Sequence, residues 1–158
     1  MIKDLSKNSK DNNGNRKFKI AIVRSNYYKE LADSLEKACK EHLVYCGIEE
    51  NNITAFEVPG SWEIPLLAKK IAKAKKFNGI IAFGIIIKGE TFHFELIANE
   101  CARALMNISL AFDIPITFEI LTTYNLEQAK KRSMGKYNKG IEAAKTLLSM
   151  LETFYEES

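Results

Sequence analysis

The sequence has no long apolar run, few cysteines and little net charge, and each of these features excludes a class of protein. No stretch approaches the roughly 20 consecutive apolar residues of a membrane-spanning helix, so we expect no membrane segment. The three cysteines are odd in number and form no CxxC pair, which favours free thiols in a reducing cytoplasm over a disulfide framework. A net charge of +3 is too small to indicate a nucleic-acid partner. We therefore expect a cytoplasmic protein that binds neither membranes nor nucleic acid.

The motifs of several large enzyme classes are also missing. Neither GxGxxG nor GxxxxGK[ST] occurs, so the sequence supports neither a dinucleotide-binding fold nor a P-loop. There is no GxSxG, and Ser61 in PGSWE lacks the second glycine of a hydrolase nucleophile elbow. A weak metal-ligand pattern places Cys39, His42 and Cys46 on one helical face, but its two cysteines lie roughly 10 Å apart along the helix axis. That separation is too long for two sulfurs on one zinc ion, so burial without a metal is the better interpretation.

Length and composition indicate one globular domain preceded by a polar segment. A chain of 158 residues with 46% apolar and 27% charged residues can bury a core without disulfides or metals. Residues 1–17 contain neither the apolar core of a secretory signal nor an arginine-rich amphipathic pattern. We expect them to form a flexible polar tail. The globular domain is then expected over 18–158.

Short apolar runs alternate with longer segments of helical periodicity. The run at 79–87 is apolar on both faces, as expected for a middle strand of a parallel sheet. Strands that alternate with helices predict a layered α/β domain with right-handed crossovers. The predicted strands are 18–23, 53–58, 79–87 and 114–121, and the predicted helices are about 28–46, 63–76, 92–111, 125–133 and 138–155.

Two of the predicted helices have clear inward and outward faces. The lysines of the run at 69–76 fit the solvent-exposed face of the second helix better than a contact with nucleic acid. Pro65 is expected in the first turn of that helix, where its missing N–H does least harm. The residues predicted to face inward are Leu66, Leu67, Ile71 and Ala72 in this helix, and Ala144, Leu147, Leu148, Leu151 and Phe154 in the last one.

The carboxyl ends of the predicted strands are the expected place for a ligand, because open parallel sheets bind ligands there. The segments that follow the strands are RSNYY, PGSWE, KGETFHF and LTTYN. In KGETFHF, Gly89 allows a close approach of the backbone, and the next helix begins with exposed N–H groups that favour an anion. His93 lies in the first turn of that helix, where imidazole could pass protons. The motif alone leaves open that His93 has no chemical task.

The segments PGSWEIP, KGETFHF and LTTYNLEQAKKR…NKG occur in this order, and together they resemble the lumazine synthase family. The resemblance covers about residues 18–155. It implies a flavodoxin-like three-layer αβα sandwich with a four-stranded parallel sheet. It also implies a homopentamer, in many members one of twelve in a hollow shell of sixty subunits, with active sites between neighbouring subunits. Riboflavin synthase is a further partner that it suggests, and no metal or organic cofactor is expected.

The implied reaction is the penultimate step of riboflavin biosynthesis. A 5-amino-6-ribitylamino-pyrimidinedione condenses with 3,4-dihydroxy-2-butanone 4-phosphate to give 6,7-dimethyl-8-ribityllumazine, phosphate and water. An alternative is a flavin- or lumazine-binding shell protein with weak or lost catalysis, because Ser25 stands where most members have a large aromatic ring. Tyr27 or Tyr28 is then the candidate to supply a ring. A phospho-receiver is less well supported, since Arg24 and Ser25 end the first strand where a receiver needs acidic residues.

The resemblance also implies a role for individual residues. His93 matches the proton-transfer histidine. Gly89, Glu90 and Thr91 match the phosphate-binding turn, and Arg132 matches the arginine that reaches this phosphate from the neighbouring subunit. Phe118 matches a wall residue of the neighbour, and Lys139 matches a lysine near a ring carbonyl. The full set expected around the pyrimidine and its ribityl chain is Ser25, Asn26, Ser61, Trp62, Glu63, Ile86, Ile87, Phe118 and Lys139.

Overall fold

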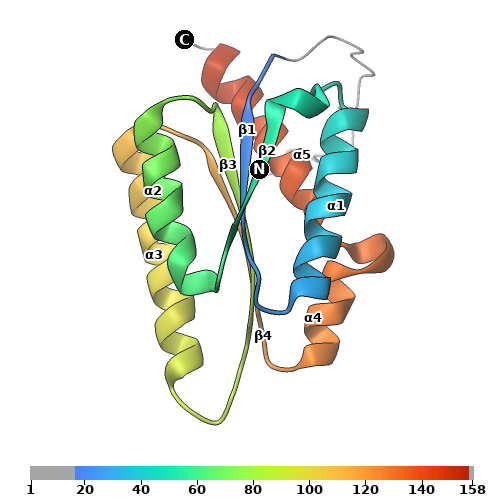
Figure 1. Ribbon diagram of the computed structural model, residues 1–158, viewed down its shortest axis with the longest axis vertical. Helices are drawn as coiled ribbons and strands as arrows, with labels where there is room; N and C mark the ends of the chain where they lie inside the picture. The colour runs from blue at the N-terminus through green and yellow to red at the C-terminus, as the bar shows by residue number, and fades with distance from the viewer. Residues whose placement is uncertain (1–16, 157–158) are drawn as a thin grey trace, which may run out of the picture.

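A four-stranded parallel sheet lies between two layers of helices in the computed structural model, which describes residues 17–156 (Figure 1). The strand order is β2-β1-β3-β4, and every neighbouring pair is parallel. Helices α2 and α3 cover one face of the sheet, and α1, α4 and α5 cover the other (Figure 1). The predicted flavodoxin-like three-layer sandwich is therefore confirmed. The strands are β1 Ile20–Ser25, β2 Ile53–Val58, β3 Gly79–Ile87 and β4 Ile116–Thr123.

The helices begin and end close to the predicted positions. Pro65 lies in the first turn of α2, as predicted. None of the helices in the described part of the chain combines the length and the apolar character needed to cross a membrane. The polar tail expected at 1–17 falls almost wholly outside the described residues, so this expectation stays a prediction. The helices are α1 Lys29–Tyr45, α2 Ile64–Ala74, α3 His93–Phe112, α4 Leu126–Ser133 and α5 Lys139–Glu156, and short 3₁₀ turns lie at Glu50–Asn52, Ser61–Glu63 and Gly135–Tyr137.

Two apolar cores stabilise the sandwich, one on each face of the sheet. Successive side chains of a strand point to opposite faces, so β1 sends Ile20 and Ile22 toward α1 and α5, and Ala21 and Val23 toward α2 and α3. The apolar run of β3 divides between both cores in the same way. This double burial explains why the run carries no polar residue, and it places both central strands firmly within the sheet.

Two strands and two side chains differ from the sequence predictions. Strand β1 starts and ends two residues later than predicted, and so does β4. The prediction that Leu66 faces inward is wrong, since 77% of it is exposed. Helix α2 buries Ile64, Ala68, Ile71 and Ala72 instead, a stripe at helical spacing from which Leu66 points away. Phe154 is also partly exposed at the end of α5, where its ring packs edge-on against Tyr155.

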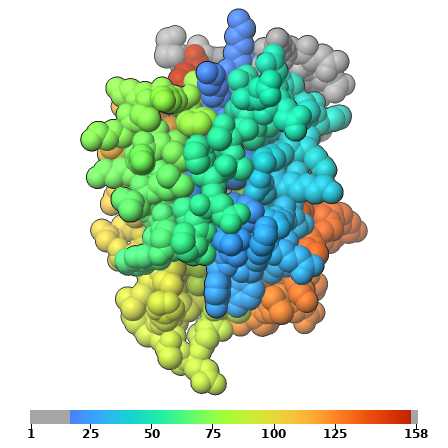
Figure 2. Space-filling model, in the orientation of Figure 1, coloured from blue at the N-terminus to red at the C-terminus, as the bar shows by residue number. Residues whose placement is uncertain are grey.

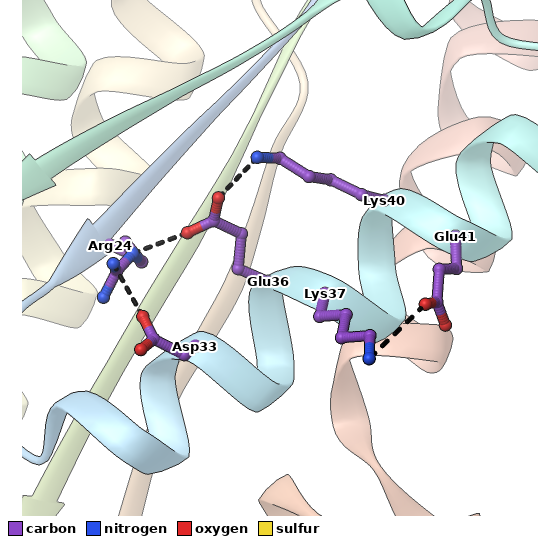
Figure 3. A pocket seen from close by; sticks show the side chains of 6 residues that line it. All are labelled: Arg24, Asp33, Glu36, Lys37, Lys40 and Glu41. Atoms are coloured by element: carbon purple, nitrogen blue, oxygen red, sulfur yellow. Dashed lines mark hydrogen bonds and ion pairs between the residues drawn. The ribbon is translucent and has the colours of Figure 1, made fainter.

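Because β1 extends through Ser25, Arg24 is part of the strand and its side chain is only 8% exposed. Its guanidinium lies 2.7 Å from Asp33 Oδ1, 2.5 Å from Glu36 Oε2 and 2.7 Å from Glu57 Oε2. The first two carboxylates come from α1 and the third from β2, so Arg24 joins three elements. Figure 3 shows the two α1 carboxylates converging on the guanidinium at the edge of a hollow of about 410 Å³. Lys40 neutralises part of the negative charge by contacting Glu36 at 2.5 Å.

Replacing Arg24 with Met is expected to destabilise the fold, because three carboxylates then repel one another without a cation between them. We expect the free energy of unfolding to fall by about 2 kcal/mol, less than the full cost for a buried pair because Asp33 and Glu57 are partly solvated. Urea unfolding at one fixed protein concentration measures the change.

Lys37→Met is the matched control for this substitution. Lys37 and its partner Glu41 are both largely exposed on α1 (Figure 3), so the same loss of a charge is expected to change the free energy by less than about 0.5 kcal/mol. Equal effects of the two substitutions would contradict the role given to the buried Arg24.

Candidate active site

A cavity of about 820 Å³ opens at the carboxyl edge of the sheet. Its walls come from the segments that follow β1, β2 and β3 and from the first turns of α3. These segments meet in the lower half of Figure 2, where the blue, green and yellow-green regions adjoin. The chain runs from β1 to a neighbour on one side and then to β3 on the other side, so the cavity lies at the topological switch point of the sheet. Open α/β sheets bind their ligands at this point.

Eight of the predicted site residues line this cavity together. They come from two separate parts of the chain, 61–63 and 86–93, which the parallel sheet brings side by side. The roles that the family resemblance gives them stay predictions. The eight residues are Ser61, Trp62, Glu63, Ile86, Ile87, Gly89, Thr91 and His93.

Three other predicted residues lie near the cavity without forming its wall. Ser25 is fully buried at the end of β1, and its hydroxyl has no hydrogen-bond partner among the described residues. Asn26 is exposed, and its backbone N–H donates to the Val58 carbonyl at 2.7 Å, which ties the end of β1 to the end of β2. Glu90 is exposed in the turn before α3.

The remaining three predicted residues do not line the cavity and lie on β4 and on the helices that follow it. Phe118 is 39% exposed on β4. Arg132 is exposed on α4, where its guanidinium donates to the Gln128 carbonyl at 3.2 Å. Lys139 begins α5 and lies 2.6 Å from Glu142. A single chain therefore does not bring these three to the cavity.

The turn Ser61–Glu63 is held against β3 by close packing and hydrogen bonds. A Cβ atom at Gly84 would come within 2.5 Å of Ser61 Oγ, so only glycine lets the turn lie this close to the strand. The Cys101 thiol donates to the Ser61 carbonyl at 3.3 Å, and burial raises the pKa of this thiol to about 11, which keeps the donor protonated. Glu63 Oε2 accepts from the Gly60 N–H at 3.0 Å. The second carboxylate oxygen of Glu63 has no hydrogen bond to the described residues and is available to a ligand.

The segment between β3 and α3 has the features of an anion site. Helix α3 begins at His93, and its N-cap residue Phe92 offers no side-chain hydrogen bond, so N–H groups of the first turn remain available. Thr91 Oγ1 makes only a long contact, 3.5 Å, with the His93 N–H. A Cβ at Gly89 would meet no atom within 4 Å, and the backbone there is not left-handed. The fold therefore does not require glycine at this position, and its absent side chain leaves space for a ligand.

The His93 ring is exposed on the cavity wall. It makes no hydrogen bond to the residues described here, so both ring nitrogens can reach a ligand. It lies directly after the turn at 89–91, beside the unpaired N–H groups at the start of α3. An imidazole in this place can transfer protons to and from a molecule whose anionic group is held by the turn.

Sequence reasoning missed several residues of the wall. Leu96, Ile97 and Glu100 line the cavity because they follow His93 at helical spacing on one face of α3. That spacing was readable in the sequence once His93 was placed at the start of the helix. Tyr27 and Tyr28 also line the cavity, and they were predicted only as a replacement for the ring missing at Ser25.

The weak metal pattern on α1 does not form a ligand set. Within residues 17–156, no group of three or more His, Cys, Asp or Glu side chains could hold a metal ion. Cys39 is buried in the core between the sheet and α5, and burial raises its pKa far above the usual thiol range. Cys46 Sγ instead contacts His42 Nε2 at 3.5 Å.

Comparison with known proteins identifies the family to which the chain belongs. The family model described as 6,7-dimethyl-8-ribityllumazine synthase matches residues 17–154. The chain belongs to this family. The resemblance read from the three sequence motifs is thereby confirmed, and the match includes every strand and helix that contributes to the cavity.

Curated proteins named 6,7-dimethyl-8-ribityllumazine synthase match most of the chain. The protein from Ruthia magnifica subsp. Calyptogena magnifica is 47% identical over 149 residues, which are 88% of this chain and 89% of the relative. The one from Vesicomyosocius okutanii subsp. Calyptogena okutanii is 47% identical over 141 residues, 85% of this chain and 84% of the relative. The one from Leuconostoc mesenteroides is 44% identical over 137 residues, 86% of this chain and 88% of the relative. These lumazine synthases therefore correspond to the chain over nearly their whole length.

A second titratable feature lies on β4, away from the cavity. Partial burial and, to a smaller extent, the Glu142 carboxylate raise the pKa of Glu119 to about 7, although Lys139 opposes the shift. Because the pKa of the folded state is above that of the unfolded chain, protonation of Glu119 favours the fold. This contribution is fully present below about pH 4.5 and is lost as the pH rises through 7.

Glu119→Gln is therefore expected to change how stability depends on pH. The variant should resemble the parent near pH 5 and exceed it near pH 8 by on the order of 1 kcal/mol, a value reduced by solvent around the partly exposed carboxylate. Thermal unfolding followed by circular dichroism at both pH values measures this. Glu50→Gln, an exposed carboxylate without an ion pair among the described residues, is the control and should give no pH-dependent difference. A Glu119→Gln effect of the same size at both pH values would refute the assignment.

Proposed function

We propose that the chain catalyses the condensation of 5-amino-6-ribitylamino-pyrimidinedione with 3,4-dihydroxy-2-butanone 4-phosphate to 6,7-dimethyl-8-ribityllumazine, with release of phosphate and water. The observation that carries this proposal is the family match over residues 17–154. The cavity at the carboxyl edge supports it, because it combines an anion site, an imidazole and a free carboxylate oxygen within one hollow of about 820 Å³.

The turn at 89–91 and the start of α3 suit the phosphate of the ketose. Backbone N–H groups at a helix start attract anions, and the helix dipole adds to this attraction. The space beside Gly89 accommodates the phosphate oxygens, and the Thr91 hydroxyl can donate to one of them. Arg132 of a neighbouring subunit supplies the guanidinium that completes the site, since it does not reach the cavity of its own chain.

The other end of the cavity suits the pyrimidine and its ribityl chain. The available oxygen of Glu63 accepts hydrogen bonds from ribityl hydroxyls, and the turn with Ser61 and Trp62 presents backbone groups beside it. Ile86 and Ile87 end β3 and place their backbone next to the ring. Asn26, together with Phe118 and Lys139 from the β4 side, completes the expected contacts.

The chemistry begins when an amine of the pyrimidine attacks the ketone and loses water to form an imine. Elimination then breaks the C–O bond to phosphate, and the second amine closes the ring with loss of water. His93 carries protons between the nitrogen and oxygen atoms that change charge in these steps. The condensation involves no net oxidation or reduction of the substrates, so no redox cofactor is required. Holding both substrates in one cavity contributes several kcal/mol by removing the entropy cost of their encounter.

We further propose a homo-oligomer whose sites lie between subunits. Leu66 of α2 and Met106 and Leu110 of α3 are each at least 61% exposed. A surface of this kind is typical of an interface. A pentamer, or a shell of sixty such subunits, in the cytoplasm is the assembly we favour, and riboflavin synthase is the partner expected to consume the product.

Lumazine formation by the parent and by Gly89→Ala tests the proposed reaction. Product fluorescence should rise faster with the parent than in the spontaneous reaction of the two substrates. Gly89→Ala should raise the KM for the ketose phosphate on the order of tenfold to a hundredfold, because its methyl group enters the space left for the phosphate.

Thermal stability of Gly89→Ala is the internal control, since the backbone there accepts any side chain and the melting temperature should not fall. A parent rate no greater than the spontaneous background would refute the proposed reaction. An unchanged KM for the ketose phosphate in Gly89→Ala would contradict the proposal that this turn binds the phosphate.

Mixing two inactive or slow variants tests the shared site. His93→Ala and Arg132→Ala damage the same site from different subunits, so oligomers that are unfolded together and reassembled from both should contain intact sites. In a randomly assembled ring, a site is intact only when the subunit that supplies His93 is the Arg132→Ala variant and the neighbour that supplies Arg132 is the His93→Ala variant. In an equal mixture, each condition is met half of the time, so about a quarter of the parental activity is expected.

A mixture of His93→Ala with Gly89→Ala is the matched control. Both residues line the cavity of one chain, so no intact site can form and activity should not recover. Failure of the first mixture to exceed the second would contradict a site built from two subunits.

A further inference from the structure

The turn at 89–91 makes few contacts with the rest of the chain. All three of its residues are exposed. A Cβ at Gly89 would meet no atom within 4 Å, and Thr91 Oγ1 makes only the long contact with the His93 N–H. The position of the turn therefore depends on the residues at its two ends.

Lys88 precedes the turn, and both its backbone and its ammonium group lie against the end of β4. Its N–H donates to the Thr123 carbonyl at 2.9 Å, which continues the pairing of β3 with β4 beyond the end of β3. Its Nζ lies over the Tyr124 ring, 5.6 Å from the ring centroid, which is within the range of a cation–π interaction. The first end of the turn is thus held by the last residue of β4 and by the residue that follows it.

Phe94 follows the turn, and its ring contacts the same tyrosine. The centroids of the Phe94 and Tyr124 rings lie 6.4 Å apart, and the interplanar angle is 34°. Phe94 belongs to the first turn of α3 and lines the cavity, so this contact fixes the helix start that carries His93. Tyr124 therefore contacts both ends of the segment 88–94.

Tyr124 is itself held by the start of α4. Its N–H donates to Gln128 Oε1 at 3.0 Å, and the Gln128 N–H donates to Asn125 Oδ1 at 2.8 Å. Both bonds belong to the cap of α4, and they fix the backbone of Tyr124 while its side chain stays 68% exposed. The Tyr124 hydroxyl makes no hydrogen bond to the described residues, so the ring makes the contacts with Lys88 and Phe94.

Glu95 explains why the place of the Lys88 ammonium matters for a bound anion. Glu95 lies in the first turn of α3, and its Oε2 is buried without a hydrogen-bond partner among the described residues. Its other oxygen lies 3.9 Å from Lys88 Nζ. This carboxylate repels a phosphate at the start of α3 unless a cation offsets its charge. Lys88, held over the Tyr124 ring and beside Glu95, supplies that cation.

We propose that Tyr124 is a positioning residue for the phosphate-binding turn and acts through Lys88 at one end and Phe94 at the other. The proposal rests on the proposed function, which places the ketose phosphate at this turn. Tyr124 does not line the cavity, so it affects the substrate only through the residues that it holds. Its ring keeps the turn and the Lys88 ammonium in place beside the N–H groups at the start of α3.

Steady-state kinetics of the assembled protein test this role. Tyr124→Leu should raise the KM for the ketose phosphate about threefold to tenfold, because two weak ring contacts are lost, and should leave the KM for the pyrimidine unchanged. Tyr124→Phe keeps the ring, so both of its KM values should stay within about twofold of the parent.

Tyr45→Leu is the matched control. Tyr45 is an exposed tyrosine at the end of α1, outside the cavity, and its ring also makes a tilted contact, with His42 at 6.0 Å. Its loss should leave both KM values unchanged. An unchanged KM for the ketose phosphate in Tyr124→Leu overturns the proposal. Equal rises in both KM values also overturn it, and so does a Tyr124→Phe variant as impaired as Tyr124→Leu.

A double substitution tests whether Tyr124 acts through Lys88. Lys88→Met alone should raise the KM for the ketose phosphate, because the charge of Glu95 is then not offset. In this background, Tyr124→Leu should raise the KM by a smaller factor than it does in the parent, since one of the two contacts of the ring is already lost. An equal factor in the two backgrounds would contradict the proposal.

Hydrogen exchange followed by mass spectrometry tests the same role without requiring turnover. Tyr124→Leu should speed exchange at the first hydrogen-bonded amides of α3, such as the Leu96 N–H that donates to the Phe92 carbonyl at 3.3 Å, and should leave the exchange of α1 and α2 unchanged. Unchanged exchange at the start of α3 overturns the proposal. A parent protein without turnover refutes the proposed reaction, whereas the exchange measurement still decides whether Tyr124 holds the turn.

Discussion

The parallel pairing of β1 with β2 and β3 is the constraint on which the rest of the structure depends. Parallel strands place all their carboxyl ends at one edge, so segments separated by more than sixty residues, such as Tyr27 and His93, line the same cavity. The pairing also buries β1 and β3 on both faces, which explains the apolar sequence of β3 and of β1 as far as Val23. The site is thus a direct product of sheet topology.

Arg24 shows how the fold holds this edge in place. A buried guanidinium is unfavourable unless it is paired, and Arg24 is paired with three carboxylates, two from α1 (Figure 3) and one from β2. The ion pairs join β1 to β2 and to α1 on one face, immediately before the segment that carries Asn26, Tyr27 and Tyr28 into the cavity. On the other face, Gly84 lets the turn Ser61–Glu63 pack directly on β3. The Arg24 ion pairs therefore position the segment after β1, and the contact at Gly84 positions the turn Ser61–Glu63.

The sequence predicted the order of strands and helices because their apolar patterns are local. Strand β3 was placed correctly at both ends, since an uninterrupted apolar run lies between Asn78 and Lys88. The burial of Arg24 was not predictable, because its partners come from elements whose contact depends on the sheet order. The outward direction of Leu66 was missed for a similar reason: α2 has apolar residues on more than one side, and only packing selects the buried one.

Of the candidate site, the sequence motifs located the turns around Ser61 and Gly89 and the histidine between β3 and α3. They did not reveal the left-handed conformation of Tyr28, which has no glycine to mark it. Nor can a single chain show how Phe118, Arg132 and Lys139 meet a substrate, because these residues lie at the β4 side, outside its own cavity. In the proposed oligomer, they would reach the substrate from a neighbouring subunit.

A crystal or electron-microscopy structure of the assembled protein with 6,7-dimethyl-8-ribityllumazine and inorganic phosphate bound tests the central claim most directly. We expect the heterocycle between the ends of β1 and β3, and the phosphate at the turn 89–91 with Arg132 of a neighbouring subunit beside it. A heterocycle bound elsewhere, for example in the hollow beside Arg24 and α1, would contradict the account.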